Sequence, residues 1–595
     1  MRWVPRKQDS LLSGSTNAAI DIAAIAVELE REVKLPTVLA RLLAERGISS
    51  AEQARGFLNP TLADLHSPYL MNGMREAVER LSAAIENKER ILIYGDYDVD
   101  GTMATVILKT VIELLGGTCD FHVPHRLLEG YGMRDEVIER AAEQGIRLVI
   151  SVDTGIRAFA AAETAKRLGL DLIVTDHHLP HDRGNPEALA VLNPNQQSCP
   201  YPTKGLCGAG VAFKVAQALL EKSGRERLIP SFLKVVAIAT IADSVPLVGE
   251  NRVFVRLGLD GLRNPVNPGL RALLEICELN HGRALTSTEI AFRIAPRMNA
   301  AGRMDVAKDV IELFSVKDKD RAKELAEKLN GLNIQRQQEE LRISDAIRKQ
   351  IDGSDDLSKA FCIVVDGDQW HRGIIGICAS RVVERYSRPA LVISRDGEEA
   401  HGSGRSFANF HLLDALESCS ELFTRFGGHA HAVGFALPSE KIPELRARLD
   451  AYARERLTEA DLEAVMEFDG DLELTELTPA FWSALQQLQP FGMGNPEPIF
   501  VTREVRALES RILKEKHLKL KLNRYSAGQV SGALSRAVDA LGWRMAERLA
   551  AAPIAAGDRL DVAFRLELNT HPDFGGGLQL ILQDFTLGVV TAAGD

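Results

Sequence analysis

Four short apolar segments in the first half of this chain lead into aspartates. They cover residues 91–94, 148–152, 172–175 and 235–239, are rich in Ile and Val, and alternate with stretches of helical periodicity. Apolar segments of strand length that alternate with helical stretches predict a mostly parallel sheet covered by helices. The first half of the chain is therefore expected to form an α/β domain with all four segments as strands.

The aspartates that follow these segments are expected to meet in space. The first segment is followed by Asp96, Asp98 and Asp100, and the others by Asp153, by Asp176 with His177 and His178, and by Asp243. In parallel α/β sheets, ligands bind outside the carboxyl ends of the strands, so the four turns should converge on one cleft. Carboxylates packed together repel one another unless cations neutralise them, and Asp oxygens with His nitrogens suit Mn²⁺ or Mg²⁺. We therefore expect two divalent metal ions in this cleft.

Each of these residues also has a structural explanation. A single Asp at a strand end is more often a helix N-cap or a turn residue, and a single His is more often a satisfied structural side chain. Four such ends in series and two adjacent histidines, His177 and His178, favour a site instead. Gly95 and Gly101, which bound the first loop, allow a phosphate to approach the backbone closely.

The rest of the chain predicts further domains, because 595 residues exceed what one core normally holds. Leu and Ile at helical spacing among many charged residues predict a long helix at 318–351. Strand-like segments at 361–365 and 390–393 predict a second α/β domain, and alternation at 518–522 and 562–568 predicts a small β-barrel. The expected division is an N-terminal helical region at 1–75, the first α/β domain at 76–315, a connecting long helix at 316–353, the second α/β domain at 354–460 and the barrel at 461–592.

Two motifs, Asp-His-His at 176–178 and Gly-Asp-Tyr-Asp-Val-Asp-Gly at 95–101, resemble the DHH phosphoesterases. Within that superfamily the chain resembles the RecJ family of single-strand-specific DNA exonucleases. Three further motifs, at 206–214, 295–303 and 490–498, are also similar to that family, so the resemblance extends over nearly the whole chain. It implies a parallel-sheet DHH domain joined by the long helix to a second α/β domain, called DHHA1, and a C-terminal OB-like β-barrel.

The resemblance also implies roles for the clustered side chains. Metal ligands carry over to Asp98, Asp100, Asp153, His177 and Asp243. His178 would lie near the scissile phosphate, Asp176 would orient the two histidines, and Asp96 is a further candidate at the catalytic centre. Some relatives have a metal-binding His four residues before the first ligand Asp, where this chain has Tyr94, so one ion is expected to be held more weakly.

Arginines near the cluster are candidates for holding the substrate phosphates. Arg126 follows the next predicted strand after the first acidic loop. Arg297, Asn299 and Arg303 lie in a stretch that looks too rich in Gly, Ala and Asn for a plain amphipathic helix. Bidentate phosphate binding is a common use of Arg, but a solvent-exposed side chain without a ligand is the alternative for each of them.

Two later regions carry further candidates for substrate binding. Ser403, Arg405 and His429 lie in glycine-rich segments that are expected to leave backbone amides open to an anion, and they match substrate-binding positions of DHHA1 domains. Alternation places Lys519 and Lys521 on one face of a barrel strand, and OB-type barrels often follow a nucleic-acid backbone with such a face. Simple turns and a solvated strand face are the alternatives.

Charge and cysteine content narrow the function classes. The 71 Lys and Arg against 82 Asp and Glu give a net charge of −11, so a nucleic-acid partner must meet a local basic surface such as residues 503–524. Seven scattered cysteines without a CxxC pair suit neither a disulfide framework nor a zinc ribbon, and favour a reducing compartment. Because no signal peptide or membrane-length apolar segment is recognisable, we expect a cytoplasmic protein that does not engage a membrane.

These patterns predict a metal-dependent exonuclease that acts on single-stranded DNA. The RecJ resemblance implies 5′-to-3′ hydrolysis with release of mononucleotides, in DNA repair and recombination, by a monomer whose candidate partners are a helicase and a single-strand-binding protein. A DHH phosphodiesterase for short oligonucleotides or cyclic dinucleotides is the first alternative, although such relatives usually lack the barrel. A non-catalytic DNA-binding DHH scaffold is the second, although the complete acidic cluster argues against it.

Overall fold

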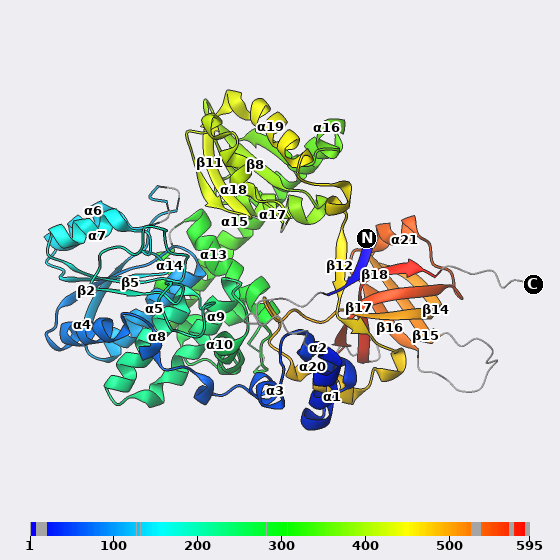
Figure 1. Ribbon diagram of the computed structural model, residues 1–595, viewed down its shortest axis with the longest axis horizontal. Coiled ribbons are helices and arrows are strands. Elements are labelled where there is room, and N and C mark those ends of the chain that lie inside the picture. The colour runs from blue at the N-terminus through cyan, green and yellow to red at the C-terminus, as the bar shows by residue number, and fades with distance from the viewer. Residues whose placement is uncertain are drawn as a thin grey trace, which may run out of the picture. The chain divides into compact units, whose positions relative to one another are not determined.

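The computed structural model describes residues 2–6, 21–126, 128–130, 132–280, 282–305, 307–407, 409–524, 537–569 and 576–588. The chain forms two compact units (Figure 1). Unit 1 comprises Met1–Leu65, Pro246–Val253 and Val465–Asp595, and unit 2 comprises His66–Val245 and Phe254–Ala464. All of the acidic turns identified above belong to unit 2.

Unit 2 contains a five-stranded sheet in which every pairing is parallel. In the order β3-β2-β4-β5-β6, its strands are β3 (Thr118–His122), β2 (Arg90–Tyr94), β4 (Leu148–Val152), β5 (Asp171–Thr175) and β6 (Ala190–Leu192). All residues of β4 are buried, as expected for a parallel strand with both faces covered. The strand order reverses at β2, because β3 pairs on one side of it and β4 on the other. Ligands of open α/β sheets bind at such a switch point.

Helices cover both faces of this sheet (Figure 1). They are α6 (Asp135–Glu143) and α7 (Phe159–Arg167) on one face, and α4 (Met74–Glu86), α5 (Val99–Leu114) and α8 (Gly208–Lys222) on the other. Asp98 caps the first turn of α5, where its carboxylate accepts a hydrogen bond of 3.0 Å from the Gly101 amide. Helices α5 and α8 pack against each other, and their amino ends meet, because Asp100 in the first turn of α5 accepts from the first amides of α8.

The segment 235–239 is not a strand, and that part of the sequence prediction is wrong. It belongs to helix α9 (Leu233–Ala242), in which every residue from Val235 to Ile241 is buried. A segment whose residues are all apolar shows neither the two-residue period of a strand nor the 3.6-residue period of a helix. Its secondary structure therefore cannot be predicted from periodicity. Asp243 is the C-cap of this helix and therefore reaches the acidic cluster from a helix end.

The Gly- and Ala-rich stretch with Arg297, Asn299 and Arg303 is also helical, contrary to the expectation. It forms α13 (Ala295–Met304), which follows the short α12 (Ser287–Glu289) and a π-helical turn, η4 (Ile290–Ile294). Small residues here allow close packing and do not prevent a helix. A Cβ added at Gly302 would lie 2.2 Å from the carbonyl oxygen of Tyr97, so α13 rests directly on the first acidic loop.

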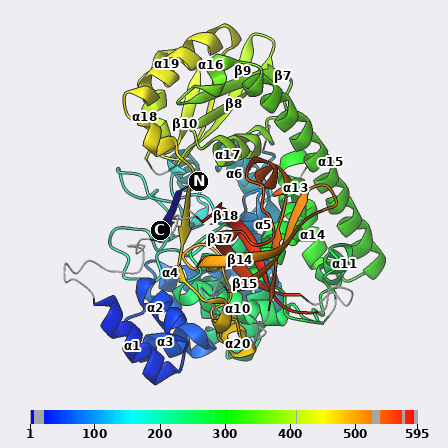
Figure 2. The ribbon, with the colours of Figure 1, turned by 90° about the vertical axis from the view of Figure 1, so that its right-hand side faces the viewer.

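The predicted long helix is confirmed as α15 (Lys319–Asp352), which Asp318 caps. Its first half buries Leu325 and Leu329, and its second half contributes Ile343 and Ile347 to the core of the following sheet. Figure 2 shows α15 extending from the level of α11 and α14 to the sheet that contains β7 and β8. The helices it packs against are α11 (Pro268–Ile276), α13, α14 (Lys308–Ser315), α16 (Asp355–Ser358) and α17 (Ile375–Tyr386).

The second sheet of unit 2 is mixed, with strand order β10-β11-β9-β8-β7. Its strands are β7 (Ile363–Asp368), β8 (Ala390–Asp396), β9 (Glu399–Arg405), β10 (Arg425–His429) and β11 (Ala432–Pro438), and its remaining helices are α18 (Leu412–Glu417) and α19 (Ile442–Arg454). The glycine-rich segments around Ser403 and His429 are strands, so the expectation of loops with open amides is wrong. β9 pairs with β8 and with β11, and its glycines leave room for larger side chains: a Cβ on Gly402 would lie 2.0 Å from the Phe435 ring, and one on Gly404 would lie 2.7 Å from Val433.

Unit 1 contains a closed five-stranded barrel, because β17 pairs with both β18 and β14. The strands are β14 (Phe500–Leu513), β15 (His517–Arg524), β16 (Val538–Gly542), β17 (Arg559–Asn569) and β18 (Gly577–Leu587), with β13 (Gly470–Asp471) on β14 and the short helix α21 (Ala546–Ala551) beside β15. Leu518, Leu520 and Leu522 are buried, as the alternation in β15 predicted. The parallel sheet, the mixed sheet and the barrel confirm the predicted fold class.

Unit 1 also contains the motif at 490–498 and several further elements. They are β1 (Arg2–Pro5) paired with β12 (Val465–Phe468), and helices α1 (Ile22–Val33), α2 (Thr37–Glu45), α3 (Ala51–Leu58) and α20 (Pro479–Gln487); α10 (Gly249–Gly261) begins in this unit. Asn495 of the motif is fully buried and donates to the carbonyl oxygens of Leu488 and Pro490. Arg252 donates to the carbonyls of Leu488 and Gln489. This motif therefore has a structural role, since it satisfies buried backbone carbonyls.

Among the helices of the described ranges, none combines the length and the apolar character that a membrane span needs.

Candidate active site

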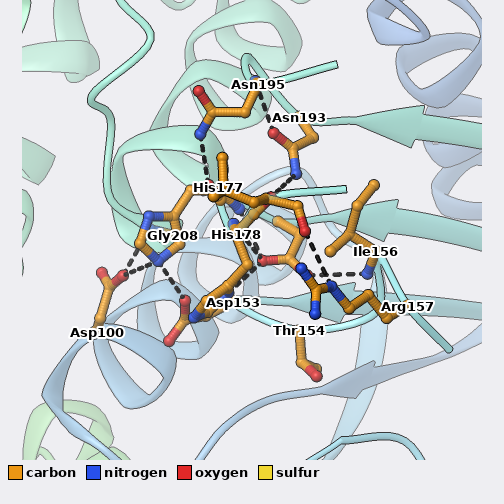
Figure 3. A network of polar contacts seen from close by, with 12 residues as sticks. Asp100, Asp153, Thr154, Ile156, Arg157, His177, His178, Asn193, Asn195 and Gly208 are labelled. Carbon is orange, nitrogen blue, oxygen red and sulfur yellow. Dashed lines mark hydrogen bonds and ion pairs between the residues drawn. The ribbon is translucent and has the colours of Figure 1, made fainter. Parts of the chain in front are cut away.

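The loops at the carboxyl edge of the parallel sheet bring the acidic residues into one cluster, with His177 near its centre (Figure 3). His177 Nε2 lies 3.1 Å from Asp153 Oδ1 and 3.8 Å from both Asp100 Oδ2 and Asp243 Oδ2. These four side chains come from the end of β4, α5, the loop after β5 and the end of α9. Residues that are far apart in the sequence therefore present oxygen and nitrogen atoms to one point.

A second group of carboxylates adjoins the first through Asp153. One oxygen each from Asp96, Asp98 and Asp153 lie within 4.8 Å of one another, and the same limit holds for donor atoms of Asp153, His177 and His178. Asp153 has a φ of 57°, which a residue other than glycine seldom adopts. Strained backbone of this kind is typical of functional sites, where the surrounding structure imposes it.

Asp176 stands behind the cluster and fixes the two histidines. Its Oδ1 accepts hydrogen bonds from the His177 amide at 2.7 Å, from the His178 amide at 3.1 Å and from His178 Nδ1 at 2.7 Å. Such an outer carboxylate sets the tautomer and orientation of an imidazole ligand. Its geometry therefore suits the orienting role that the sequence resemblance implied.

The amino end of α8 holds Asp100. The amides of Gly208 and Ala209 donate to its two carboxylate oxygens at 2.5 and 2.8 Å. The positive end of the helix dipole thereby stabilises an ionised carboxylate. Gly208 also packs against Asp153, because a Cβ at this position would lie 2.6 Å from the Asp153 Cβ.

Burial and mutual repulsion make the ionised state of these carboxylates costly. Burial, followed by the neighbouring aspartates, raises the pKa of Asp96, Asp98 and Asp153 above the usual range, and raises the pKa of Asp243 to about 9. Burial lowers the pKa of His177, so its imidazole is neutral at neutral pH and can act as a ligand.

The pair formed by Asp176 and His178 behaves in the opposite way. Burial disfavours the charged form of both groups, but their mutual hydrogen bond lowers the pKa of Asp176 and raises the pKa of His178. The pair therefore favours an ionised carboxylate beside a protonated imidazole. A positive charge next to the acidic cluster suits a site that receives a phosphate.

The donor set fits divalent cations. Carboxylate oxygens with one neutral imidazole are the ligands that Mn²⁺ and Mg²⁺ accept. Asp96 Oδ1 is buried and has no hydrogen-bond partner within the described part of the chain. A buried carboxylate without a donor can ionise only beside a counter-charge, which a cation would supply.

The raised pKa values predict that metal binding strengthens with pH. Between about pH 4 and pH 9 the metal-free folded cluster holds protons that the unfolded chain has released, so its stability falls as pH rises. Mn²⁺ must displace those protons, so its stabilising effect should grow over the same range. Melting temperatures with Mn²⁺ and with chelator, measured between pH 6 and 9, should diverge as pH rises. A difference that stays constant would show that these carboxylates are not the metal ligands.

Three arginines gather beside the acidic cluster. Burial, together with the charges of Arg126 and Arg405, lowers the pKa of Arg303 to about 10, while Asp98 opposes this shift. The pKa of Arg405 is lowered by burial and by Arg126. A buried guanidinium whose pKa is lowered by neighbouring positive charges is stabilised by a counter-anion. A phosphate placed here would satisfy them and would adjoin the carboxylates.

Ser403 and α17 complete this arginine cluster. Arg405 Nη1 donates to Ser403 Oγ at 3.1 Å, and a Cβ on Gly376 in the first turn of α17 would lie 3.0 Å from that oxygen. Arg303 reaches across to the loop before α17, where it donates to the Gly373 carbonyl at 2.8 Å. Helix amino ends and arginines together are typical of phosphate sites.

Two other predicted residues have structural contacts near the site. Asn299 Oδ1 accepts from the Val99 amide at 3.2 Å and so supports the first acidic loop. Arg297 Nε donates to Asn330 Oδ1 on α15 at 2.9 Å, which holds its guanidinium against the long helix.

His429 lies at the exposed end of β10 and pairs in register with Ala432 of β11. Arg405 of β9 pairs with the same residue from the other side, so the side chains of His429 and Arg405 flank β11 on one face of the sheet.

The barrel lysines belong to unit 1 and differ from each other. Lys519 Nζ lies 3.1 Å from Asp539 Oδ2, whereas Lys521 is exposed and lines a pocket with Trp482. Arg503 and Arg524 of the same basic segment also lie near acidic groups, Asp471 and Glu473. Much of the predicted positive charge is therefore compensated locally.

Several residues of the site were missed by the sequence analysis. Gly208 and Ala209 bind Asp100 through their amides, and Asn195 and Asn193 donate to the carbonyls of His177 and His178 at 2.6 and 2.9 Å (Figure 3). The motif at 206–214 was noticed only as part of the resemblance. Its opening Leu-Cys-Gly-Ala-Gly, with small residues at a helix start, was the signal that could have identified an amide donor.

Three family models match parts of this chain. Residues 90–240 match the family model of the DHH family, N-terminal domain; residues 358–455 match the DHHA1 domain; and residues 468–584 match the RecJ OB domain. The family resemblance predicted from the motifs is thereby confirmed.

Two curated relatives and a solved structure agree with the family models. The chain is 35% identical to the single-stranded-DNA-specific exonuclease RecJ of Dickeya dadantii, over 93% of this chain and 97% of that protein. It is 40% identical to the Bacillus subtilis protein of the same name over 79% of this chain, but spans only 59% of that protein's length. The crystal structure of RecJ in complex with Mn²⁺ from Thermus thermophilus is similar with a TM-score of 0.80 and 30% identity, over 98% of this chain and 79% of that one.

Proposed function

This chain belongs to the RecJ family of single-stranded-DNA-specific exonucleases, and from this premise we propose that it hydrolyses single-stranded DNA from the 5′ end and releases mononucleotides. One observation carries the proposal: a cluster of carboxylates and histidines adjoins a cluster of arginines within a single unit, because α13, which carries Arg303, rests on the first acidic loop and Arg303 reaches the loop before α17. The first cluster suits metal-assisted hydrolysis, and the second suits a phosphate.

Two divalent ions fit the arrangement of donors. One would be held by Asp98 and Asp153, with Asp96 adjacent, and the other by Asp100, His177 and Asp243. Such ions, when bound, lower the pKa of a coordinated water and neutralise charge on a phosphodiester. The protein contributes the placement: Gly208 and Ala209 fix Asp100, while Asp176 fixes both histidines.

The chain's own residues would hold the scissile phosphate beside this centre. His178, whose protonated form is favoured by Asp176, would place a positive charge near a non-bridging oxygen. The arginine cluster would hold a phosphate at the terminus of the strand, because Ser403, Arg405 and the start of α17 converge on one point. A terminal phosphate held there would leave the next phosphodiester close to the carboxylates, which accounts for release of one nucleotide at a time.

A digestion experiment tests the proposed function and its polarity. Single strands labelled at the 3′ end, with a 5′ phosphate or a 5′ hydroxyl, are incubated with the protein and Mn²⁺. The proposal expects mononucleotides from the first product onward and slower digestion of the 5′-hydroxyl strand. Release of the 3′ label before internal nucleotides, or no release at all, would contradict it. RNA strands and blunt duplexes are included because the site residues alone do not assign the sugar.

Replacing Arg405 by alanine should remove the preference for a 5′ phosphate. The KM for the phosphorylated strand is expected to rise about ten- to hundredfold, because a charge-assisted phosphate contact contributes about 1.5–3 kcal/mol. The KM for the 5′-hydroxyl strand should change much less. Arg385→Ala, an exposed arginine on α17, is the matched control. Equal effects on both strands would place Arg405 outside the terminal-phosphate site.

In the barrel, Lys521→Ala should weaken DNA binding and reduce its salt dependence, whereas Lys519→Ala should have the smaller effect. Lys521 is exposed, but Lys519 is paired with Asp539 and would lose that partner on binding a phosphate. The measurement is the slope of log Kd against log salt concentration for a long oligonucleotide. An unchanged slope for Lys521→Ala would remove this strand from the DNA path.

The alternatives have separate signatures. A phosphodiesterase for short substrates would act faster on dinucleotides than on long strands, and a binding scaffold would release no nucleotides although it bound them. For the exonuclease, we propose a role in DNA repair and recombination in which a helicase supplies the single strand and a single-strand-binding protein covers it. All seven cysteines are free, which suits a reducing compartment such as the cytoplasm, where we place the protein as a monomer.

A further inference from the structure

Tyr94 ends β2 immediately before the first acidic loop and is fully buried. Its ring packs in the core of the parallel sheet and lies 5.0 Å, centroid to centroid, from the ring of His122. A phenylalanine would fill the same volume. The hydroxyl group must therefore be explained by its polar contacts.

This hydroxyl connects β2 to the backbone between β3 and α6. It donates to the Gly132 carbonyl and accepts from the Arg134 amide, both at 3.2 Å. Gly132 and Arg134 lie in irregular backbone just before α6 begins. Tyr94 thereby satisfies one carbonyl and one amide that belong to neither a strand nor a helix.

Glu129 lies in the same connection and contacts residues near both of its ends. Its Oε1 accepts from the His125 amide at 2.8 Å, and its Oε2 lies 3.1 Å from His122 Nε2. Its carbonyl accepts from Arg134 Nε at 3.0 Å. These contacts tie the start of the connection to its end, so movement at Gly132 and Arg134 would be passed to His125.

Arg126 directly follows His125. Its guanidinium carbon lies 5.0 Å from the centre of the Tyr97 ring, above the acidic loop. Burial is the main cause of the shifted pKa values of Asp96, Arg303 and Arg405, and the charge of Arg126 lowers all three, in agreement with a position beside both clusters. The position of Arg126 therefore depends on how the backbone between β3 and α6 is held.

We propose that the Tyr94 hydroxyl is a positioning group for the substrate: by holding Gly132 and Arg134 it fixes the braced connection that presents Arg126 to the DNA phosphate. The inference rests on the proposed function, because it concerns the grip on the strand. It differs from the expectation that Tyr94 weakens one metal site, since the hydroxyl acts through Arg126.

The test is Tyr94→Phe, which removes the hydroxyl and keeps the ring. The KM for 5′-phosphorylated single strands should rise about three- to tenfold, as expected for the loss of two neutral hydrogen bonds that position a charged group. The kcat and the Mn²⁺ concentration for half-maximal rate should remain unchanged. Hydrogen exchange at the Arg134 amide should accelerate, while exchange in β4 should not.

A double variant separates positioning from a general loss of stability. Arg126→Ala should raise the KM by itself, and Tyr94→Phe added to it should cause little further change, because both act through one guanidinium. Tyr452→Phe, on α19 with its ring against Phe410, is the matched control and should change none of these quantities.

A higher Mn²⁺ requirement at unchanged KM would overturn the proposal. A double variant whose rise in KM equals the product of the two single-variant rises would also overturn it. Unchanged exchange at the Arg134 amide would also overturn it. Wild-type protein that releases no nucleotides would instead contradict the proposed function. The exchange measurement on Tyr94→Phe would still decide whether the hydroxyl holds the connection.

Discussion

Alanine at His177 is expected to lower kcat on single-stranded DNA by about 10³-fold or more, although the strand still binds. His177 Nε2 lies within 3.8 Å of carboxylate oxygens of Asp153, Asp100 and Asp243. Its loss therefore removes the nitrogen donor from the group of side chains that would bind the metal. Changes at outer partners of a metal ligand already cost about 10- to 100-fold, and removal of a ligand should cost more. The substitution does not alter the arginine cluster, so the affinity for the DNA phosphates should be retained.

The measurement pairs single-turnover rates with binding of a nuclease-resistant phosphorothioate strand. The dissociation constant of His177→Ala should stay within about threefold of the wild-type value, because the arginine contacts are kept. His181→Ala, an exposed histidine in the same connection, is the control and should keep full activity. Loss of binding in proportion to loss of rate would show that His177 contacts DNA instead of organising the cluster.

Gly208→Ala is expected to lower kcat by about 10²-fold or more without unfolding the protein. The added Cβ would lie 2.6 Å from the Asp153 Cβ and 2.7 Å from Asp153 Oδ1, so either the carboxylate or α8 must shift. A displacement of about 1 Å at a catalytic group can cost about 100-fold. Alanine otherwise favours a helix over glycine, so the melting temperature of the metal-free protein should not fall much.

Gly210→Ala, one half-turn further along α8, is the matched control. Its Cβ would lie 3.4 Å from the Leu206 Cβ, an ordinary contact, so activity and metal affinity should be retained. If Gly208→Ala kept full activity, the close packing of α8 against Asp153 would have no catalytic consequence. If both variants lost activity with lower melting temperatures, helix packing would be the cause.

The sequence predicted the scaffold of the site wherever its pattern was local. Apolar segments closed by aspartates identified β2, β4 and β5, and leucine spacing identified α15, because strand and helix periods are visible over a few residues. The prediction failed at 235–239, where burial on all sides erases the period. It failed again around Ser403, because strand pairing with β8 and β11 depends on segments distant in the sequence.

Candidate side chains could be listed from the sequence, but not the backbone that holds them. Asp100 depends on two amides at the start of α8, about a hundred residues later, and amides carry no residue-type signal. Tyr94 appeared only as a departure from a metal-binding His, because its partners are a carbonyl and an amide. The pairing of Lys519 with Asp539 was equally invisible, since it joins neighbouring strands across a long connection.

Anomalous X-ray diffraction from crystals of the full chain soaked in Mn²⁺ tests the central claim most directly, since it locates the ions without assuming their ligands. We predict two peaks at the carboxyl edge of the parallel sheet, one beside Asp98 and Asp153 and the other beside Asp100 and His177. Both peaks should disappear or weaken in His177→Ala. Mn²⁺ bound elsewhere, with no peak among these side chains, would contradict the account.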